Sequence, residues 1–162
     1  EHLQAISTAV KLPVLRKDFI ISEYQIYEAK TIGADAALLI CALLETSMIR
    51  EFLDIAASVG LDVLVEAHDE SEVESALNAG AEIIGVNNRN LKDFSVDLQN
   101  SLRLRSLVPR DKIFVSESGI TCAADIKLLR TAGVNGVLIG EMLMRSNNIT
   151  LDLQRLSGEM ND

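Results

Sequence analysis

The sequence lacks several features that mark whole classes of protein. It has no run of Lys and Arg and a net charge of −9, so we expect no nucleic-acid partner. No apolar run approaches the roughly 20 residues that span a membrane, and no signal-peptide pattern opens the sequence. Its two cysteines, Cys41 and Cys122, lack the spacing of a metal site. We therefore expect a cytoplasmic protein with reduced cysteines, no bound metal and no membrane partner.

The chain has enough apolar residues for one sizeable core. Of its 162 residues, 48% are hydrophobic and 24% are charged, as in an ordinary folded domain. It contains no Gly-x-Gly-x-x-Gly motif and no Walker loop, which argues against a nucleotide-binding sheet. We predict a single domain over residues 1–162.

Short apolar runs rich in Val, Ile and Leu recur along the chain. They begin near Val14, Ala37, Asp62, Ile83, Ile113 and Gly136. Between them lie stretches with helical periodicity, at residues 23–31, 47–58, 71–79, 101–107 and 123–131. Four of these stretches end near a glycine, at Gly33, Gly60, Gly80 and Gly133. A glycine in this position typically ends a helix, so the pattern predicts helices joined to the next strand by tight loops.

Alternating strands and helices predict an α/β fold with parallel strands and right-handed crossovers. Polar residues end almost every apolar run, which favours a (β/α)8 TIM barrel over an open doubly wound sheet. A complete barrel has eight strands in about 250 residues, whereas this chain supplies about six strand–helix units. We therefore expect a partial TIM barrel, a fragment that lacks two strands on its amino-terminal side.

The segment 12–20 is interpreted as a buried strand that carries a lysine at its carboxyl end. Lys17 would lie at the edge of an apolar core, where it is a candidate proton donor. Glu66 and Glu117 end two later apolar runs, and Asn87 ends another. Because the carboxyl ends of barrel strands converge on one mouth, we expect these four side chains to form an acid–base site.

Each acid–base candidate also has a structural interpretation. Lys17 can reach out to solvent, and Glu66 can form an ion pair with Lys17 or Arg89. Glu117 can cap the following helix, and Asn87 can be a turn residue. Their joint occurrence at strand ends makes an entirely structural interpretation the weaker one.

A second set of residues suits an anionic aromatic substrate. Arg89 can hold a phosphate or carboxylate with two hydrogen bonds, or form a salt bridge at the rim. Gly119 and Gly140 follow the last two strands, where many barrels hold a phosphate on backbone N–H groups. Glu141 must then turn its carboxylate away from the phosphate. Phe19 belongs either to the core or to the wall of an aromatic-binding site.

Five segments together resemble indole-3-glycerol phosphate synthase. They are LPVLRKDFI at 12–20, LVEAH at 64–68, IGVNNRNL at 84–91, VSESGI at 115–120 and VLIGEMLMR at 137–145. The order and spacing match from about residue 1 to residue 145. The resemblance implies a (β/α)8 barrel of tryptophan biosynthesis, of which this chain covers the third to the eighth strand.

The resemblance also implies a carboxy-lyase reaction. The phosphorylated aromatic substrate would be 1-(2-carboxyphenylamino)-1-deoxyribulose 5-phosphate, which closes a pyrrole ring with loss of carbon dioxide and then water. No cofactor and no metal would be needed. By resemblance, Lys17 is the general acid on the ribulose carbonyl, Glu66 and Glu117 position the lysine and handle protons, and Asn87 binds substrate.

The remaining matches concern the two ends of the substrate. By resemblance, Ser118, Gly119, Gly140 and Glu141 belong to the phosphate loops. Arg89 lies near the anthranilate or phosphate end, and Phe19 lies against the aromatic ring. A glutamate and a lysine that the family carries on its first strand have no counterpart in this chain.

Two alternatives stay open. One is another phosphate-binding barrel, such as phosphoribosylanthranilate isomerase. The other is a non-catalytic, truncated barrel that assembles with partner chains. Loss of two strands would leave open strand edges, which can pair with another chain and allow self-association.

Overall fold

The computed structural model describes residues 2–90 and 93–158. Strands in this part of the chain are β1 Leu15–Arg16, β2 Ala36–Ile40, β3 Asp62–Ala67, β4 Ile83–Asn87, β5 Ile113–Glu117 and β6 Gly136–Leu138. Helices are α1 His2–Ala9, α2 Glu23–Thr31, α3 Thr46–Ser58, α4 Glu70–Ala79, α5 Gln99–Leu104, α6 Ala123–Ala132, α7 Glu141–Met144 and α8 Ile149–Ser157. Short 3-10 helices cover Cys41–Leu43 and Arg105–Leu107. This alternation confirms the predicted α/β class.

The six strands form one sheet, whose order follows the chain from β1 to β6. The pairs β1–β2, β2–β3 and β5–β6 are parallel. Parallel neighbours require a crossover between consecutive strands, and helices provide it here. The six-stranded sheet is consistent with part of a TIM barrel, while the numbering of its strands within a barrel stays a prediction.

The contacts of the chain group it into two compact units. The first contains the residues up to 67 together with 71–84, and the second contains 68–70 and the residues from 85 onward. The strands β1 to β3 belong to the first unit, and β5 and β6 belong to the second.

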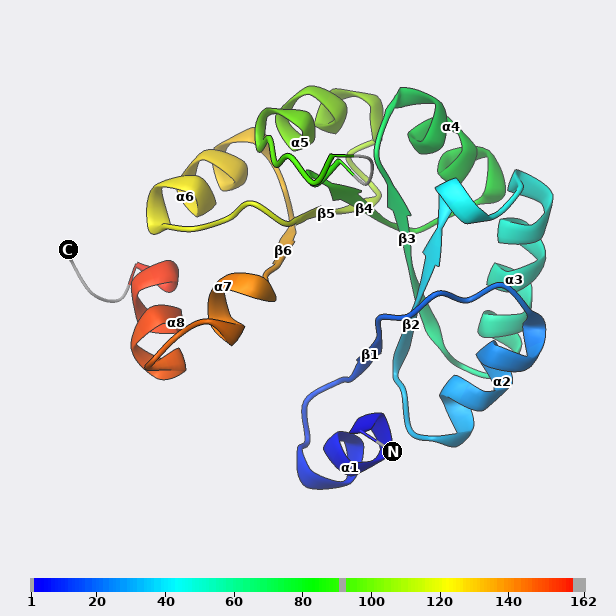
Figure 1. Ribbon diagram of the computed structural model, residues 1–162. Helices are drawn as coiled ribbons and strands as arrows, with labels where there is room; N and C mark the ends of the chain where they lie inside the picture. Colours follow the sequence, from blue (N-terminus) through cyan, green and yellow to red (C-terminus); the bar gives the residue numbers. More distant parts are fainter. Residues whose placement is uncertain (1, 91–92, 159–162) are drawn as a thin grey trace. The chain divides into compact units, whose positions relative to one another are not determined.

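In the first unit, α2, α3 and α4 lie along the same side of β1 to β3 (Figure 1). The strands β2 and β3 are buried at almost every position, as is typical of strands inside a parallel sheet. The helix α3 contributes Ile49, Phe52 and Ala56 to the core, at the spacing of one helix face.

The first strand departs from the prediction of a buried strand over 12–20. Only Leu15–Arg16 pairs with β2, both residues are half-buried, and Leu12 is 75% exposed. The position of β1 at the end of the sheet order explains this difference. An edge strand has a neighbour on one side only, so its apolar residues are not enclosed.

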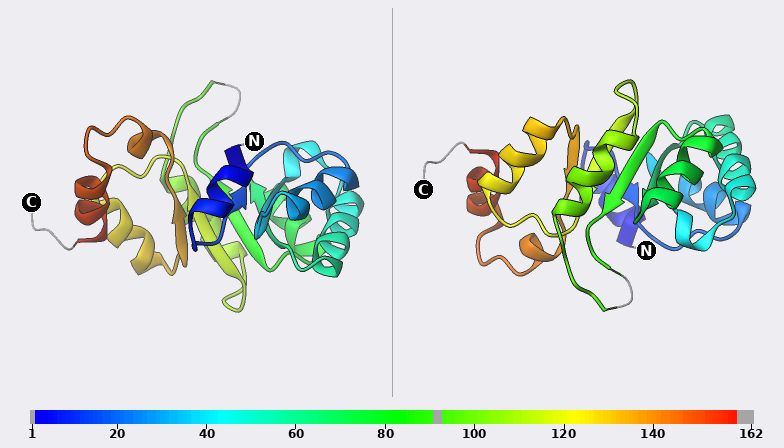
Figure 2. Two further views of the ribbon diagram at one scale, coloured as in Figure 1. Left: turned by 90° about the horizontal axis from the view of Figure 1, so that it is seen from below. Right: turned by 90° about the horizontal axis from the view of Figure 1, so that it is seen from above.

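In the second unit, α6 contacts both α5 and α8, and Figure 2 shows α8 beside α6. Phe114 of β5, Leu104 of α5 and Leu129 of α6 are fully buried between these elements. The helix α6 starts at a cap in which the Asp125 carboxylate accepts hydrogen bonds from Thr121 and Cys122. Burial raises the pKa of Asp125, but these hydrogen bonds lower it by more, so the pKa lies below its usual value.

The predicted helix-ending glycines are confirmed. Gly33, Gly60, Gly80 and Gly133 have φ values between +66° and +96°, the left-handed region in which helices commonly end. The predicted helices agree with α2, α3, α4 and α6 to within one residue at each end. The stretch 101–107 is instead divided between α5 and the 3-10 helix Arg105–Leu107.

Candidate active site

In the first unit, Lys17 and Glu66 form an ion pair at the carboxyl ends of β1 and β3. The Lys17 Nζ lies 3.1 Å from Glu66 Oε2. The Glu66 side chain is 3% exposed and the Lys17 side chain is 41% exposed. A buried carboxylate therefore holds an ammonium group that a solute can reach.

The sequence around Lys17 explains its direction. Successive side chains of an extended segment point to opposite faces. Arg16 points to the helices, where its guanidinium binds the Glu28 carboxylate at 2.8 Å and the Gln25 carbonyl oxygen at 3.0 Å. Lys17 consequently points to the other face of the sheet, where it meets Glu66.

The loop after β1 places Phe19 outside the core. The Gln25 side chain accepts hydrogen bonds from the N–H groups of Ile21 and Ser22, and donates one to the Phe19 carbonyl oxygen at 2.9 Å. Phe19 is 67% exposed. The core interpretation of Phe19 is therefore wrong, and its contact with an aromatic substrate stays a prediction.

In the second unit, Asn87 ends β4, and its side-chain oxygen accepts a hydrogen bond from the Arg89 N–H at 3.0 Å. Asn87 is buried. This bond turns the backbone directly after the strand, which agrees with the turn interpretation of Asn87. A role in binding substrate is compatible with its position but is not tested by it.

From the sequence, Asn88 is a turn residue rather than a ligand, but the hydrogen bonds that its side chain forms were not predicted. Its amide nitrogen donates to Ser116 Oγ and to the Ser118 carbonyl oxygen, each at 3.0 Å. Its side-chain oxygen accepts from the Ser101 N–H at 3.0 Å and from Ser101 Oγ at 2.8 Å. One feature of the sequence could have indicated these bonds: Ser116 is a small polar residue that directly follows the apolar start of β5.

The end of β5 turns sharply at Ser118 and Gly119. Glu117, the last residue of the strand, is 1% exposed, and its carbonyl oxygen accepts from the Asn88 N–H at 2.9 Å. Ser118 has a φ of +66° and Gly119 a φ of +78°. A Cβ atom on Gly119 would overlap the Val96 side chain, so this position requires glycine in both conformation and space.

Glu141 lies between two arginines at the start of α7. Its Oε2 is 2.5 Å from Arg89 Nη2, and its Oε1 is 3.0 Å from Arg145 Nη2. Both Glu141 and Arg145 are exposed. The structure thus shows the rim salt bridge that was one interpretation of Arg89. A Cβ atom on Gly140, which precedes the helix, would meet no atom within 4 Å.

The site residues therefore form two groups, one in each unit. The first unit brings together Lys17 and Glu66 and carries Phe19 on the adjoining loop. Members of the second group are Asn87, Arg89, Glu117, Ser118, Gly119, Gly140 and Glu141. Convergence of the two groups on one mouth stays a prediction. Within the described residues, no group of three or more His, Cys, Asp or Glu could hold a metal ion, and no helix could cross a membrane.

The fold defines the chain as an α/β protein whose six-stranded sheet is consistent with part of a TIM barrel. A solved structure of 3-hexulose-6-phosphate synthase from Salmonella typhimurium shares the fold, with a TM-score of 0.79 and 17% sequence identity. The match covers 98% of this chain and 79% of that chain. At this identity the likeness concerns the fold alone.

The sequence comparisons identify the family. The family model for indole-3-glycerol phosphate synthase matches residues 1–156. The indole-3-glycerol phosphate synthase of Endomicrobium trichonymphae is 61% identical over 96% of this chain and 60% of its own length. The same enzyme of Ruminiclostridium cellulolyticum is 58% identical over 98% of this chain and 61% of its own length. The chain belongs to the indole-3-glycerol phosphate synthase family, and it spans about 60% of the length of these two relatives.

Proposed function

We propose that this chain carries the strand-end catalytic groups of an indole-3-glycerol phosphate synthase. The substrate is 1-(2-carboxyphenylamino)-1-deoxyribulose 5-phosphate, and the product is indole-3-glycerol phosphate. The observation that carries the proposal is the Lys17–Glu66 pair, because it places an accessible ammonium group on a buried carboxylate at two strand ends. Family membership and the names of the relatives support the same reaction.

In the proposed first step, Lys17 is the general acid. It donates a proton to the ribulose carbonyl oxygen while the aromatic carbon that bears the carboxylate attacks the carbonyl carbon. Loss of carbon dioxide restores the aromatic ring. Loss of the new hydroxyl group and of a proton from the neighbouring carbon, together as water, completes the pyrrole. Glu66 holds the Lys17 Nζ in place at 3.1 Å, and such positioning favours proton transfer within a fixed geometry.

Glu117 and Asn87 are proposed to complete the acid–base set. Glu117 supplies a second buried carboxylate at a strand end, which suits proton transfer during the dehydration. Asn87 offers an amide to substrate oxygens. The exposed ring of Phe19 is proposed to contact the anthranilate ring.

The proposed phosphate site lies at the ends of β5 and β6. The turn at Ser118 and Gly119 has two successive residues with positive φ. The Ser118 N–H donates to the Leu138 carbonyl oxygen at 3.3 Å, so we assign the Gly119 N–H to the phosphate, since turns can present backbone N–H groups to an anion. Gly140 leaves open space in front of its backbone. The Glu141 carboxylate is compensated by Arg89 and Arg145, which reduces its repulsion of a phosphate.

We further propose that β1 to β6 are the third to eighth strands of a (β/α)8 barrel, and that both units belong to one domain. The strand order supports this assignment, because it follows the chain without interruption. We also propose a cytoplasmic location, from the sequence features described above. We propose self-association through open strand edges, because such edges can pair with another chain.

The test is an assay of the chain supplied with the part of the Endomicrobium trichonymphae relative that the match leaves uncovered. Formation of indole-3-glycerol phosphate is followed by the indole fluorescence of the product. We expect Lys17→Ala to lower turnover about 100-fold or more, the usual contribution of a general acid. The matched control is Lys11→Ala, which removes the exposed lysine directly before the segment 12–20 and should leave turnover unchanged.

The outcomes separate the alternatives. Unchanged turnover in Lys17→Ala would rule out the role of Lys17. Conversion of phosphoribosylanthranilate, with no indole product from the synthase substrate, would favour the isomerase. Absence of turnover in every variant, with assembly into larger species in sedimentation, would favour the non-catalytic alternative.

A further inference from the structure

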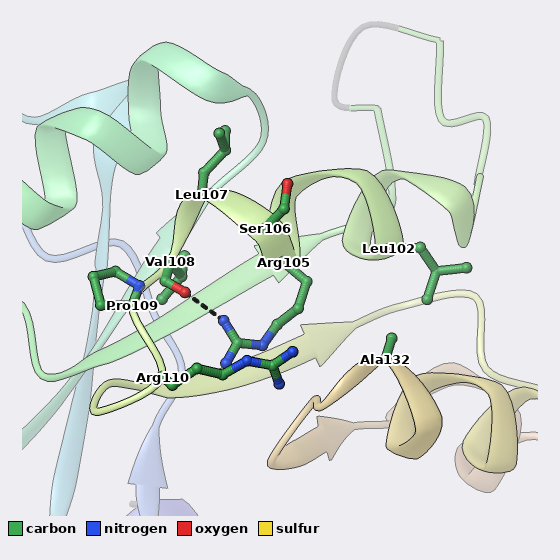
Figure 3. Close-up of a pocket in the computed structure, with 8 residues that line it drawn as sticks. All are labelled: Leu102, Arg105, Ser106, Leu107, Val108, Pro109, Arg110 and Ala132. Carbon is green, nitrogen blue, oxygen red and sulfur yellow. Dashed lines mark hydrogen bonds between the residues drawn. The ribbon is translucent and has the colours of Figure 1, made fainter.

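A pocket in the second unit lies at the amino-terminal end of β5, whereas the proposed catalytic groups follow the carboxyl ends of strands. Its volume is about 550 Å3. The 3-10 helix Arg105–Leu107, the turn that leads into β5 and the end of α6 form its walls (Figure 3). Two arginines, Arg105 and Arg110, line it together with apolar side chains that include Leu102 and Ala132.

Arg105 is a buried cation with neutral partners. It is 4% exposed. Its Nε donates to the Gly133 carbonyl oxygen at 2.8 Å, and its Nη1 donates to the Val108 carbonyl oxygen at 2.6 Å. The guanidinium carbon lies 5.3 Å from the centre of the Phe114 ring. A guanidinium has five N–H donors, so the two carbonyl oxygens leave part of its hydrogen-bonding capacity for a further acceptor.

Arg110 brings a second positive charge to the same place. Its Nη1 lies so close to Gly133 that a Cβ atom on that residue would overlap it. Both side chains reach Gly133, the residue after α6, and their guanidinium groups approach each other in Figure 3. Burial, and then the positive charge of Arg110, hold the pKa of Arg105 below its usual value. Across residues 2–90 and 93–158, neither guanidinium forms an ion pair with a carboxylate.

We propose that this pocket binds a phosphate group, free or on a small metabolite, between Arg105 and Arg110. Two adjacent guanidinium groups repel each other, and an oxyanion between them replaces that repulsion with charge-assisted hydrogen bonds. The chain as a whole carries a net charge of −9, so a local excess of positive charge distinguishes this pocket from the average surface. Arg105 is fixed by its two carbonyl partners, and Arg110 is exposed and can adjust to the ligand.

The test is a titration of the 162-residue chain with inorganic phosphate at pH 7, at an ionic strength held constant with chloride. Proton–nitrogen NMR follows the Arg105 Nε–H and the Gly133 N–H, which lie in the pocket. We expect saturable shifts of both signals. Arg110→Gln should weaken the fitted affinity about tenfold, as expected when one guanidinium contact is lost.

The matched control is Arg130→Gln, which removes the same charge from an exposed residue on the last turn of α6. It should leave the affinity within about twofold, because long-range charge effects are screened at moderate ionic strength. Signals of Gly119 and Gly140 report the proposed active site separately, so the two sites fail or succeed independently. Shifts that do not saturate, or an unchanged affinity in Arg110→Gln, would overturn the proposal.

A second titration distinguishes the two sources of the phosphate group. Glycerol 3-phosphate adds an uncharged glycerol group to the same phosphate, so it tests whether the pocket, which Leu102 and Ala132 also line, accepts more than the anion. Tighter binding of the ester assigns the pocket to a phosphorylated metabolite. Equal binding assigns it to the free anion.

Discussion

Each unit contains a glutamate that pairs with a cation near the carboxyl end of a strand, but the two glutamates have different surroundings. In the first unit, the Glu66 side chain is 3% exposed and binds Lys17. In the second unit, the Glu141 side chain is 52% exposed and binds both Arg89 and Arg145. The types of side chain are similar, so the difference between the pairs comes from their access to water.

This difference determines what each pair can do. When a buried carboxylate loses its cation, water cannot replace the lost partner, and the cost is large. When an exposed carboxylate loses its cation, water and salt compensate. Lys17 and Glu66 therefore depend on each other in both stability and position, whereas Glu141 adjusts the charge at the rim with little effect on folding.

The largest expected effect comes from breaking the buried pair with Lys17→Met. The methionine keeps most of the lysine volume but leaves the buried Glu66 carboxylate with less compensation. We expect the free energy of unfolding to fall by about 3 kcal/mol, measured by urea unfolding of the chain. Because the carboxylate is buried, this loss should hardly change between low and high salt.

The double variant Lys17→Met with Glu66→Gln controls for packing. Glutamine removes the charge that the single variant leaves behind, so most of the lost stability should return. If the single variant unfolds at the same urea concentration as the original chain, loss of the cation beside buried Glu66 does not lower the free energy of unfolding, which contradicts the prediction.

A smaller effect is expected from Asn88→Ala, which removes a buried polar group without a net charge. The change takes hydrogen-bond partners from Ser101 and Ser116, both 0% exposed. We expect a loss of about 2 kcal/mol, the cost of leaving buried polar groups unsatisfied. The control Asn78→Ala alters an exposed helical asparagine and should be nearly neutral. Equal effects of the two variants would contradict the structural role of Asn88.

Much of the fold could be predicted because its signals are local. The apolar runs placed the starts of β2 to β6 to within one residue, and the glycines after the helices marked the loops. The prediction that the first strand is buried was wrong, because burial of a strand depends on the strands and helices beside it. Residues 12–15 are apolar like the other runs, but β1 ends the sheet order and pairs with one strand only.

Those parts of the site that depend only on a residue's position at the end of a strand could be predicted from the sequence. Lys17 and Glu66 met as expected, because parallel neighbouring strands end at the same edge of a sheet. The hydrogen bonds of Asn88 and the burial of Arg105 were not predicted, because they depend on residues distant in sequence, such as Ser116 and Gly133. The sequence around Arg105 shows only helical periodicity, which does not reveal a buried guanidinium.

The smallest expected effect comes from breaking the exposed pair with Glu141→Gln. Because the carboxylate is about half exposed and its partner Arg145 is 80% exposed, the free energy of unfolding should fall by less than about 1 kcal/mol. The effect should disappear near 1 M salt, where charges are screened within about 3 Å. Urea unfolding of Glu141→Gln and Lys17→Met, each at low and high salt, tests the comparison directly. A salt-independent loss in Glu141→Gln as large as that in Lys17→Met would show that exposure does not distinguish the two pairs.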